Sequence, residues 1–236
     1  MSVDFIAVFL IGLFGGFSHC IGMCGGFVFT YSVKISEKES VTKPSKWNLL
    51  LPHLLYNSGR VLTYTFLGEI FGFLGGTIGF VMSVRNFQGG LQLFAGIFMI
   101  ILGLEMGGLI PKTSKDYFPG ISGFKKLVSN LFNRVNRRNI FGLGLVLGFI
   151  PCGLVYVAGA MAAATESILG GMLTMLFFGL GTFPAMIATG LASDFLSAKF
   201  KTNLYKISAV IIIIMGILAL LRGVDALGWM RIYWLS

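Results

Sequence analysis

Residues 16–26 read GFSHCIGMCGG and place four soft or reactive side chains inside a hydrophobic run. These side chains are His19, Cys20, Met23 and Cys24. The third cysteine of the chain, Cys152, follows a proline in GFIPC (148–152). A thiolate is both the nucleophile of thiol–disulfide exchange and a ligand for soft metals. The residue types therefore allow redox chemistry or metal binding, whereas a buried cysteine can also pack simply as a small hydrophobe.

The first interpretation is thiol–disulfide exchange between Cys20 and Cys152, with Cys24 as an accessory or resolving thiol. Exchange proceeds through a mixed disulfide, and an internal bridge needs Cα atoms about 5.5 Å apart. Pro151 and the glycines near each sulfur would permit the opening and closing movement, and His19 would stabilise a thiolate. This redox reading requires no cofactor.

The second interpretation is a site for Cu(I). His19, Cys20, Met23 and Cys24 stand at i, i+1, i+4 and i+5, which is one face of a helix. Thiolate and thioether donors favour Cu(I), imidazole is acceptable to it, and Cys152 would add a further sulfur. A third possibility is a passive partner in the assembly of an oxidase or metalloenzyme.

Four other residues stand out in the hydrophobic runs and beside them. Glu69 would relay the protons of thiol chemistry or neutralise a cation, because intramembrane carboxylates are expensive to bury without a role. Pro184 in GLGTFPA predicts a break in its helix. Arg60 in YNSGR is expected to anchor to headgroups or cap another helix, with a substrate role as the alternative, and His53 is expected to be solvated.

Composition indicates the elements that must position these residues. The chain has 236 residues, of which 56% are hydrophobic and 11% charged, against about 25% charged in soluble domains. Continuous apolar runs of about 20 residues predict transmembrane helices rather than barrel strands. We expect an all-α integral membrane protein with six spans, at 5–31, 56–82, 87–111, 140–164, 167–193 and 204–224.

The basic residues orient these spans. The net charge of +9 comes mainly from lysines and arginines in residues 34–46, 112–138 and 199–206. Because positive loops stay in the cytoplasm, both termini are expected to face outward. We therefore expect a multi-pass protein of a bacterial-type inner (cytoplasmic) membrane. Its basic residues are expected to flank the spans and contact the lipid bilayer, and we expect no nucleic-acid partner.

Two segments of the chain match in register. GLFGGFSHC (12–20) and GLVLGFIPC (144–152) align their glycines, leucine, phenylalanine and cysteine, so Cys20 corresponds to Cys152. Three spans separate the copies, which predicts two inverted three-helix repeats meeting near the bilayer midplane. The repeats would cover 1–111 and 140–236, joined by a basic amphipathic cytoplasmic linker at 112–139.

The combination of SHCIGMCGG, YNSGRVLTY, GFIPCGLVY and GLGTFPA resembles a bacterial six-helix membrane family. That family is labelled sulfite exporter TauE/SafE-like or UreH-like transmembrane domain, and is grouped with the CcdA and DsbD electron carriers of cytochrome c biogenesis. The resemblance implies that Cys20 and Cys152 are the working pair of an oxidoreductase-like carrier. Electrons would pass from cytoplasmic thioredoxin to an extracytoplasmic thioredoxin-like protein.

The first span departs from the carriers in one respect, since His19-Cys20 stands where they have Pro-Cys. Members that resemble this chain are linked with heavy-metal handling and copper supply to respiratory oxidases. That resemblance implies a metal-accepting protein as the partner in the copper reading.

Overall fold

The computed structural model describes residues 4–38, 46–76, 93, 96–97, 99–101, 103–104, 131, 139–149, 152–195 and 198–226. Within these residues the structure is helical and contains no strand. The helices are α1 (Phe5–Gly15), a π-helical turn η1 (Gly16–Cys20), α2 (Ile21–Lys38), α3 (Lys46–Gly76), α6 (Ile140–Gly148), α7 (Gly153–Ala163), α8 (Ile168–Phe195) and α9 (Ala198–Ala226). Most of the expected third span and nearly all of the linker at 112–139 lie outside the described residues.

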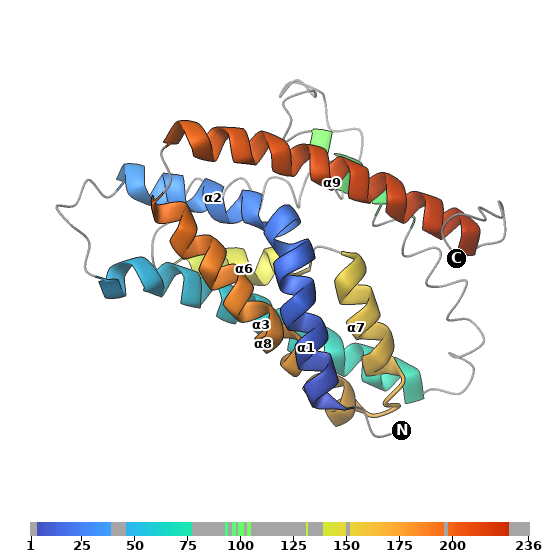
Figure 1. Ribbon diagram of the computed structural model, residues 1–236. Coiled ribbons are helices and arrows are strands. Elements are labelled where there is room, and N and C mark those ends of the chain that lie inside the picture. Colours follow the sequence, from blue (N-terminus) through green and yellow to red (C-terminus); the bar gives the residue numbers. More distant parts are fainter. Residues whose placement is uncertain are drawn as a thin grey trace.

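The long helices α3 and α8 pack against each other and form the centre of the bundle. Helix α1 lies on α8, and α6 lies on α3. Figure 1 shows α2 turning away from α1 and running beside α9. The most extensive packing thus surrounds α3 and α8, and their facing surfaces provide the core.

Two pairs of consecutive helices are bent at the break between them. The segments Phe5–Cys20 and Cys24–Ser32 meet at 69°, and Ile140–Gly148 and Gly153–Ala163 meet at 71°. Among the described residues, Ile168–Ser193 is long and apolar enough to cross a membrane by itself. Each bent pair counts as a further span if it is taken as one unit, which gives up to three.

Helix α3 is apolar outside and polar inside. Its exposed large side chains include Leu62, Phe66 and Phe73, each more than half exposed. Its buried side chains include Asn57 and Arg60, each 2% exposed. This distribution is typical of a helix that faces lipid on one side and encloses a polar interior on the other.

Pro184 does not break its helix, so that prediction is wrong. Helix α8 continues through Pro184, whose side chain is exposed, while Met186 nearby is buried. A proline removes one backbone hydrogen bond, and a transmembrane helix tolerates this when its surroundings satisfy the freed carbonyl.

Candidate thiol site

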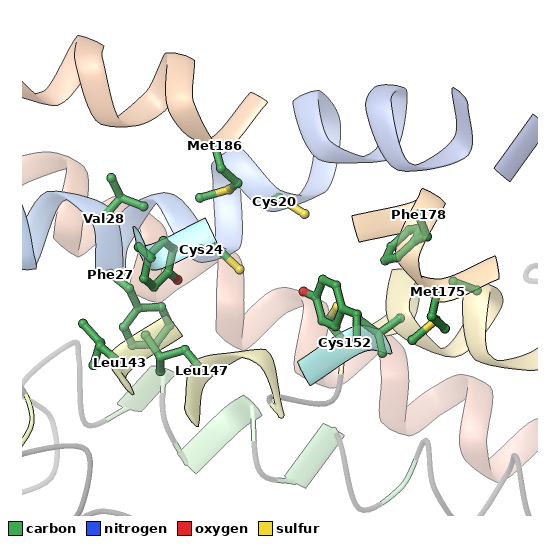
Figure 2. Packing of buried hydrophobic residues seen from close by; sticks show 14 of the residues in the cluster. Cys20, Cys24, Phe27, Val28, Leu143, Leu147, Cys152, Met175, Phe178 and Met186 are labelled. Carbon is green, nitrogen blue, oxygen red and sulfur yellow. The ribbon is translucent and has the colours of Figure 1, made fainter. Parts of the chain in front are cut away.

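The three cysteines come from three different elements and lie in one core. Cys20 ends η1, Cys24 is in the first turns of α2, and Cys152 lies between α6 and α7. Their exposed fractions are 2%, 9% and 4%, and all three are free thiols. In Figure 2 the sulfurs of Cys20 and Cys24 point toward the part of the core where Cys152 lies.

The first bend places Cys20. The π-helical turn Gly16–Cys20 interrupts the α-helical ladder, and the Ser18 hydroxyl donates to the Phe14 carbonyl at 3.0 Å. Single π-helical turns are frequent at functional sites. Glycines make the close packing possible, because a Cβ atom at Gly16 would lie 3.1 Å from the Ala185 Cβ. The bend turns Cys20 into the bundle.

The second bend places Cys152. This residue is the N-cap of α7 and has extended backbone angles, φ −118° and ψ 154°. The backbone N–H groups of Leu154 and Val155 interact electrostatically with its side chain. A helix N-terminus favours negative charge because its first N–H groups are unpaired. The local geometry therefore suits a nucleophilic sulfur at this position.

The three thiols interact with one another. The side chains of Cys20 and Cys24 form a hydrogen bond. Cys152 interacts electrostatically with both of them. The structure thus brings together the sulfurs that the sequence singled out from two distant segments.

Arg60 of α3 lies beside the thiols rather than at the membrane surface. It is 2% exposed, so the prediction that it anchors to headgroups is wrong. Its Nη2 donates to Tyr64 Oη at 2.7 Å, and its guanidinium carbon lies 5.9 Å and 5.5 Å from the ring centroids of Tyr56 and Tyr64. These ring distances are typical of cation–π contacts. The guanidinium also interacts electrostatically with the thiols of Cys20 and Cys24.

Two polar atoms in this part of the core have no hydrogen-bond partner. They are Nη1 of Arg60 itself and the hydroxyl of Tyr56, and both are buried. Buried polar atoms are nearly always paired, so exceptions need a physical explanation. Both atoms belong to residues that interact with the cysteines, so this part of the core is a candidate functional site.

His53 is also inside the bundle, and the expectation that it is solvated is wrong. It lies in α3, is 2% exposed, and its Nδ1 is 2.7 Å from the Tyr31 hydroxyl. The Tyr31 ring in turn lies 5.1 Å from that of Tyr56. Helix α3 begins at Lys46, so residues assigned to the first loop are helical. A polar and aromatic series therefore connects His53 with the surroundings of Arg60.

The remaining predicted site residues are less closely tied to the thiols. His19 precedes Cys20, is half-buried, and its Nε2 is buried without a hydrogen-bond partner. Glu69 is half-buried on α3. Met23 lies in α2, its side chain is outside the described part, and Pro151 is outside it altogether. The predicted roles of these four residues stay predictions.

No metal site is assembled by the described side chains, since no three of His, Cys, Asp or Glu there converge on a common point suited to an ion. The side chain of Met23, which the copper reading requires, is not among them. The Cu(I) site stays a prediction.

The chain matches one protein family over most of its length. The family described as the cytochrome c biogenesis protein transmembrane region matches residues 7–218, which include every helix discussed above in whole or large part. The protein belongs to this family and is thereby related to the CcdA and DsbD carriers. No curated protein and no solved structure matches the chain.

Proposed function

We propose that the protein carries two electrons at a time across the cytoplasmic membrane by opening and closing a Cys20–Cys152 disulfide. The observation that carries this proposal is the position of the two sulfurs. Each stands at the bend of a bent helix pair, both are buried, and they interact electrostatically in one core. Membership of the cytochrome c biogenesis family supports the same kind of role.

Each half of the cycle consists of two thiol–disulfide exchange steps. A thiolate of cytoplasmic thioredoxin attacks the internal disulfide, forms a mixed disulfide, and releases one thiolate of the carrier. The second thioredoxin thiol then completes reduction, which leaves Cys20 and Cys152 as thiols and thioredoxin as a disulfide. On the outer face the carrier dithiol reduces a disulfide of a thioredoxin-like protein by the same two steps.

The topology belonging to this proposal is six spans in two inverted repeats, with both termini outside. Equivalent glycine contacts support it. A Cβ atom at Gly12 would meet the Phe178 carbonyl, and one at Gly144 would meet the Tyr56 carbonyl. Gly12 and Gly144 are separated by the same number of residues as the two redox cysteines. Packing of the first bent pair on α8 thus corresponds to packing of the second on α3.

A second pair of glycines repeats the correspondence. Gly181 of α8 packs against Phe9, and Gly59 of α3 packs against Phe141. The interval from Gly59 to Gly181 equals that from Tyr56 to Phe178. A relation by a pseudo-two-fold axis accounts for both pairs at once, as expected for inverted repeats.

Thiol counting on the purified protein tests the cysteine pair. After oxidation by a disulfide-bearing thioredoxin-like protein, maleimide labelling should lose two thiols in the wild type and in Cys24→Ser. Cys20→Ser and Cys152→Ser should lose none to an internal bridge. Loss of two thiols in Cys152→Ser would instead indicate a Cys20–Cys24 pair and overturn the proposal.

Delivery of copper is the second candidate function, favoured by the unpartnered Nε2 of His19 next to Cys20. Cu(I) would be held by His19, Cys20, Met23 and Cys24 and passed to a metal-accepting protein. The reduced protein should then bind Cu(I) tightly, and His19→Ala with Met23→Ala should abolish binding. Redox cycling that survives these two substitutions, without any Cu(I) binding by the wild type, would exclude this candidate.

A further inference from the structure

Arg60 carries a positive charge in the interior of the bundle. Burying an unpaired ion costs several kcal/mol or more, so buried charges are normally paired. The groups found to interact with this guanidinium are the phenols of Tyr56 and Tyr64 and the thiols of Cys20, Cys24 and Cys152. None of these groups is a carboxylate, and thiols are more acidic than phenols.

Among the residues that the structure describes, Arg60 is the cation found to interact with the thiols. The other titratable groups found to interact with the thiols are Tyr56 and Tyr64 from α3 and Tyr156 from α7. His19 precedes Cys20 in η1 and is half-buried. From α8 come apolar neighbours, such as Phe178, whose ring lies 5.7 Å from that of Tyr64. The permanent charge available to the thiols from these groups is therefore that of Arg60.

Two tyrosines hold the guanidinium in place and leave one side open. Tyr64 accepts a hydrogen bond from Nη2, and both rings contact the cation. Nη1 is buried and has no partner. A guanidinium held in this way, which also interacts with the Cys20 side chain, is prepared for an anion that forms during the reaction.

We propose that Arg60 is the counter-charge that holds Cys20 as a thiolate inside the bilayer. The inference deepens the proposed function and rests on it. A thiolate is the attacking species in disulfide exchange, and an apolar interior disfavours it. Arg60 offsets that cost where the sulfur must react.

The proposed step takes place in the outer half of the cycle. The Cys20 thiolate attacks one sulfur of the partner disulfide, a new S–S bond forms, and the partner's other sulfur leaves as a thiolate. Cys152 then attacks Cys20 Sγ, which closes the internal disulfide and releases the second partner thiolate. Because Cys20 reacts as a thiolate, the carrier releases one proton, which comes from Cys152. This proton and a second one from water on the outer face protonate the two partner thiolates.

Alkylation of a single thiol tests the proposal without requiring electron transfer. Full-length protein in detergent, with Cys24→Ser and Cys152→Ser, retains Cys20 alone, and its reaction with neutral iodoacetamide is followed by mass spectrometry from pH 6 to pH 10. Arg60→Met should lower the rate at pH 7 at least tenfold and recover most of it at pH 10. Arg60→Lys, which keeps the charge, should lose much less.

Two further variants separate charge from structure. Arg222 is an exposed arginine of α9, so Arg222→Met removes one positive charge elsewhere and should leave the profile unchanged. Arg60→Gln keeps a donor for Tyr64 and serves if the methionine variant is not monodisperse. An unaltered pH profile in Arg60→Met or Arg60→Gln would overturn the counter-charge role. That result would leave the thiol-counting test of the carrier unaffected.

Discussion

Gly144 of α6 lies directly against the backbone carbonyl of Tyr56 in α3, and a Cβ atom at position 144 would overlap the carbonyl oxygen. Tyr56 is the residue whose ring supports the Arg60 guanidinium. This contact therefore joins the helix that leads to Cys152 with the helix that carries the buried cation. Small residues allow such close approach of helix backbones in membranes.

Gly144→Ala is expected to lower stability because neither backbone can move away without disturbing the rest of α3. Overpacking of this kind costs about 1–3 kcal/mol. Gly142→Ala on the same helix is the matched control, since its Cβ atom would lie 3.8 Å from Leu131, an ordinary contact. Thermal unfolding in detergent should show a lower midpoint for Gly144→Ala and an unchanged midpoint for Gly142→Ala. Equal midpoints would contradict the packing described.

Gly12→Ala tests the correspondence of the two halves. Its Cβ atom would meet the Phe178 carbonyl as that of Gly144→Ala meets the Tyr56 carbonyl. The two substitutions should lower the unfolding midpoint by similar amounts, and the double variant should show their sum, as distant independent sites do. A large loss for one and none for the other would count against equivalent packing.

The sequence predicts the Cys20–Cys152 pair from local evidence, and the pairing itself stays a prediction. Glycine, leucine, phenylalanine and cysteine recur in register at 12–20 and 144–152, and the structure bends the chain next to Cys20 and Cys152. Helical class and membrane character also follow from composition, which the family assignment bears out. The number of spans and their orientation stay predictions.

The polar interior is harder to predict because it depends on tertiary packing. Arg60 and His53 are near the start of an apolar run, where positive residues usually meet headgroups. In the structure α3 begins earlier, which moves both side chains into the bundle. The spacing of Tyr56, Arg60 and Tyr64 at four-residue intervals is the signal that could have placed them on one face.

Tyr64→Phe and Tyr56→Phe should affect stability differently. Tyr64 accepts the hydrogen bond from Arg60, so its loss leaves a buried charged donor unsatisfied, at a cost of about 1–3 kcal/mol. The Tyr56 hydroxyl is buried without a partner, so removing it should be neutral or slightly stabilising. Chemical denaturation of both variants measures the difference. A greater loss for Tyr56→Phe would show that its hydroxyl has a partner essential to the fold.

Gly15→Ala should slow closure of the Cys20–Cys152 disulfide more than it affects stability. A Cβ atom at Gly15 would lie 2.6 Å from a methyl group of Leu154, which follows closely after Cys152. The end of a leucine side chain can rotate, so the cost in stability should stay below about 1 kcal/mol. The altered Leu154 would nevertheless oppose the approach of α7 to η1, and an internal bridge tolerates little error in Cα separation.

Oxidation of Gly15→Ala by diamide in a Cys24→Ser background should be several-fold slower than oxidation of the parent. Gly25→Ala, whose Cβ atom would make an ordinary 3.4 Å contact with Thr189, should oxidise at the parental rate. If Gly15→Ala also keeps that rate, closure does not require α7 to approach η1 at this point.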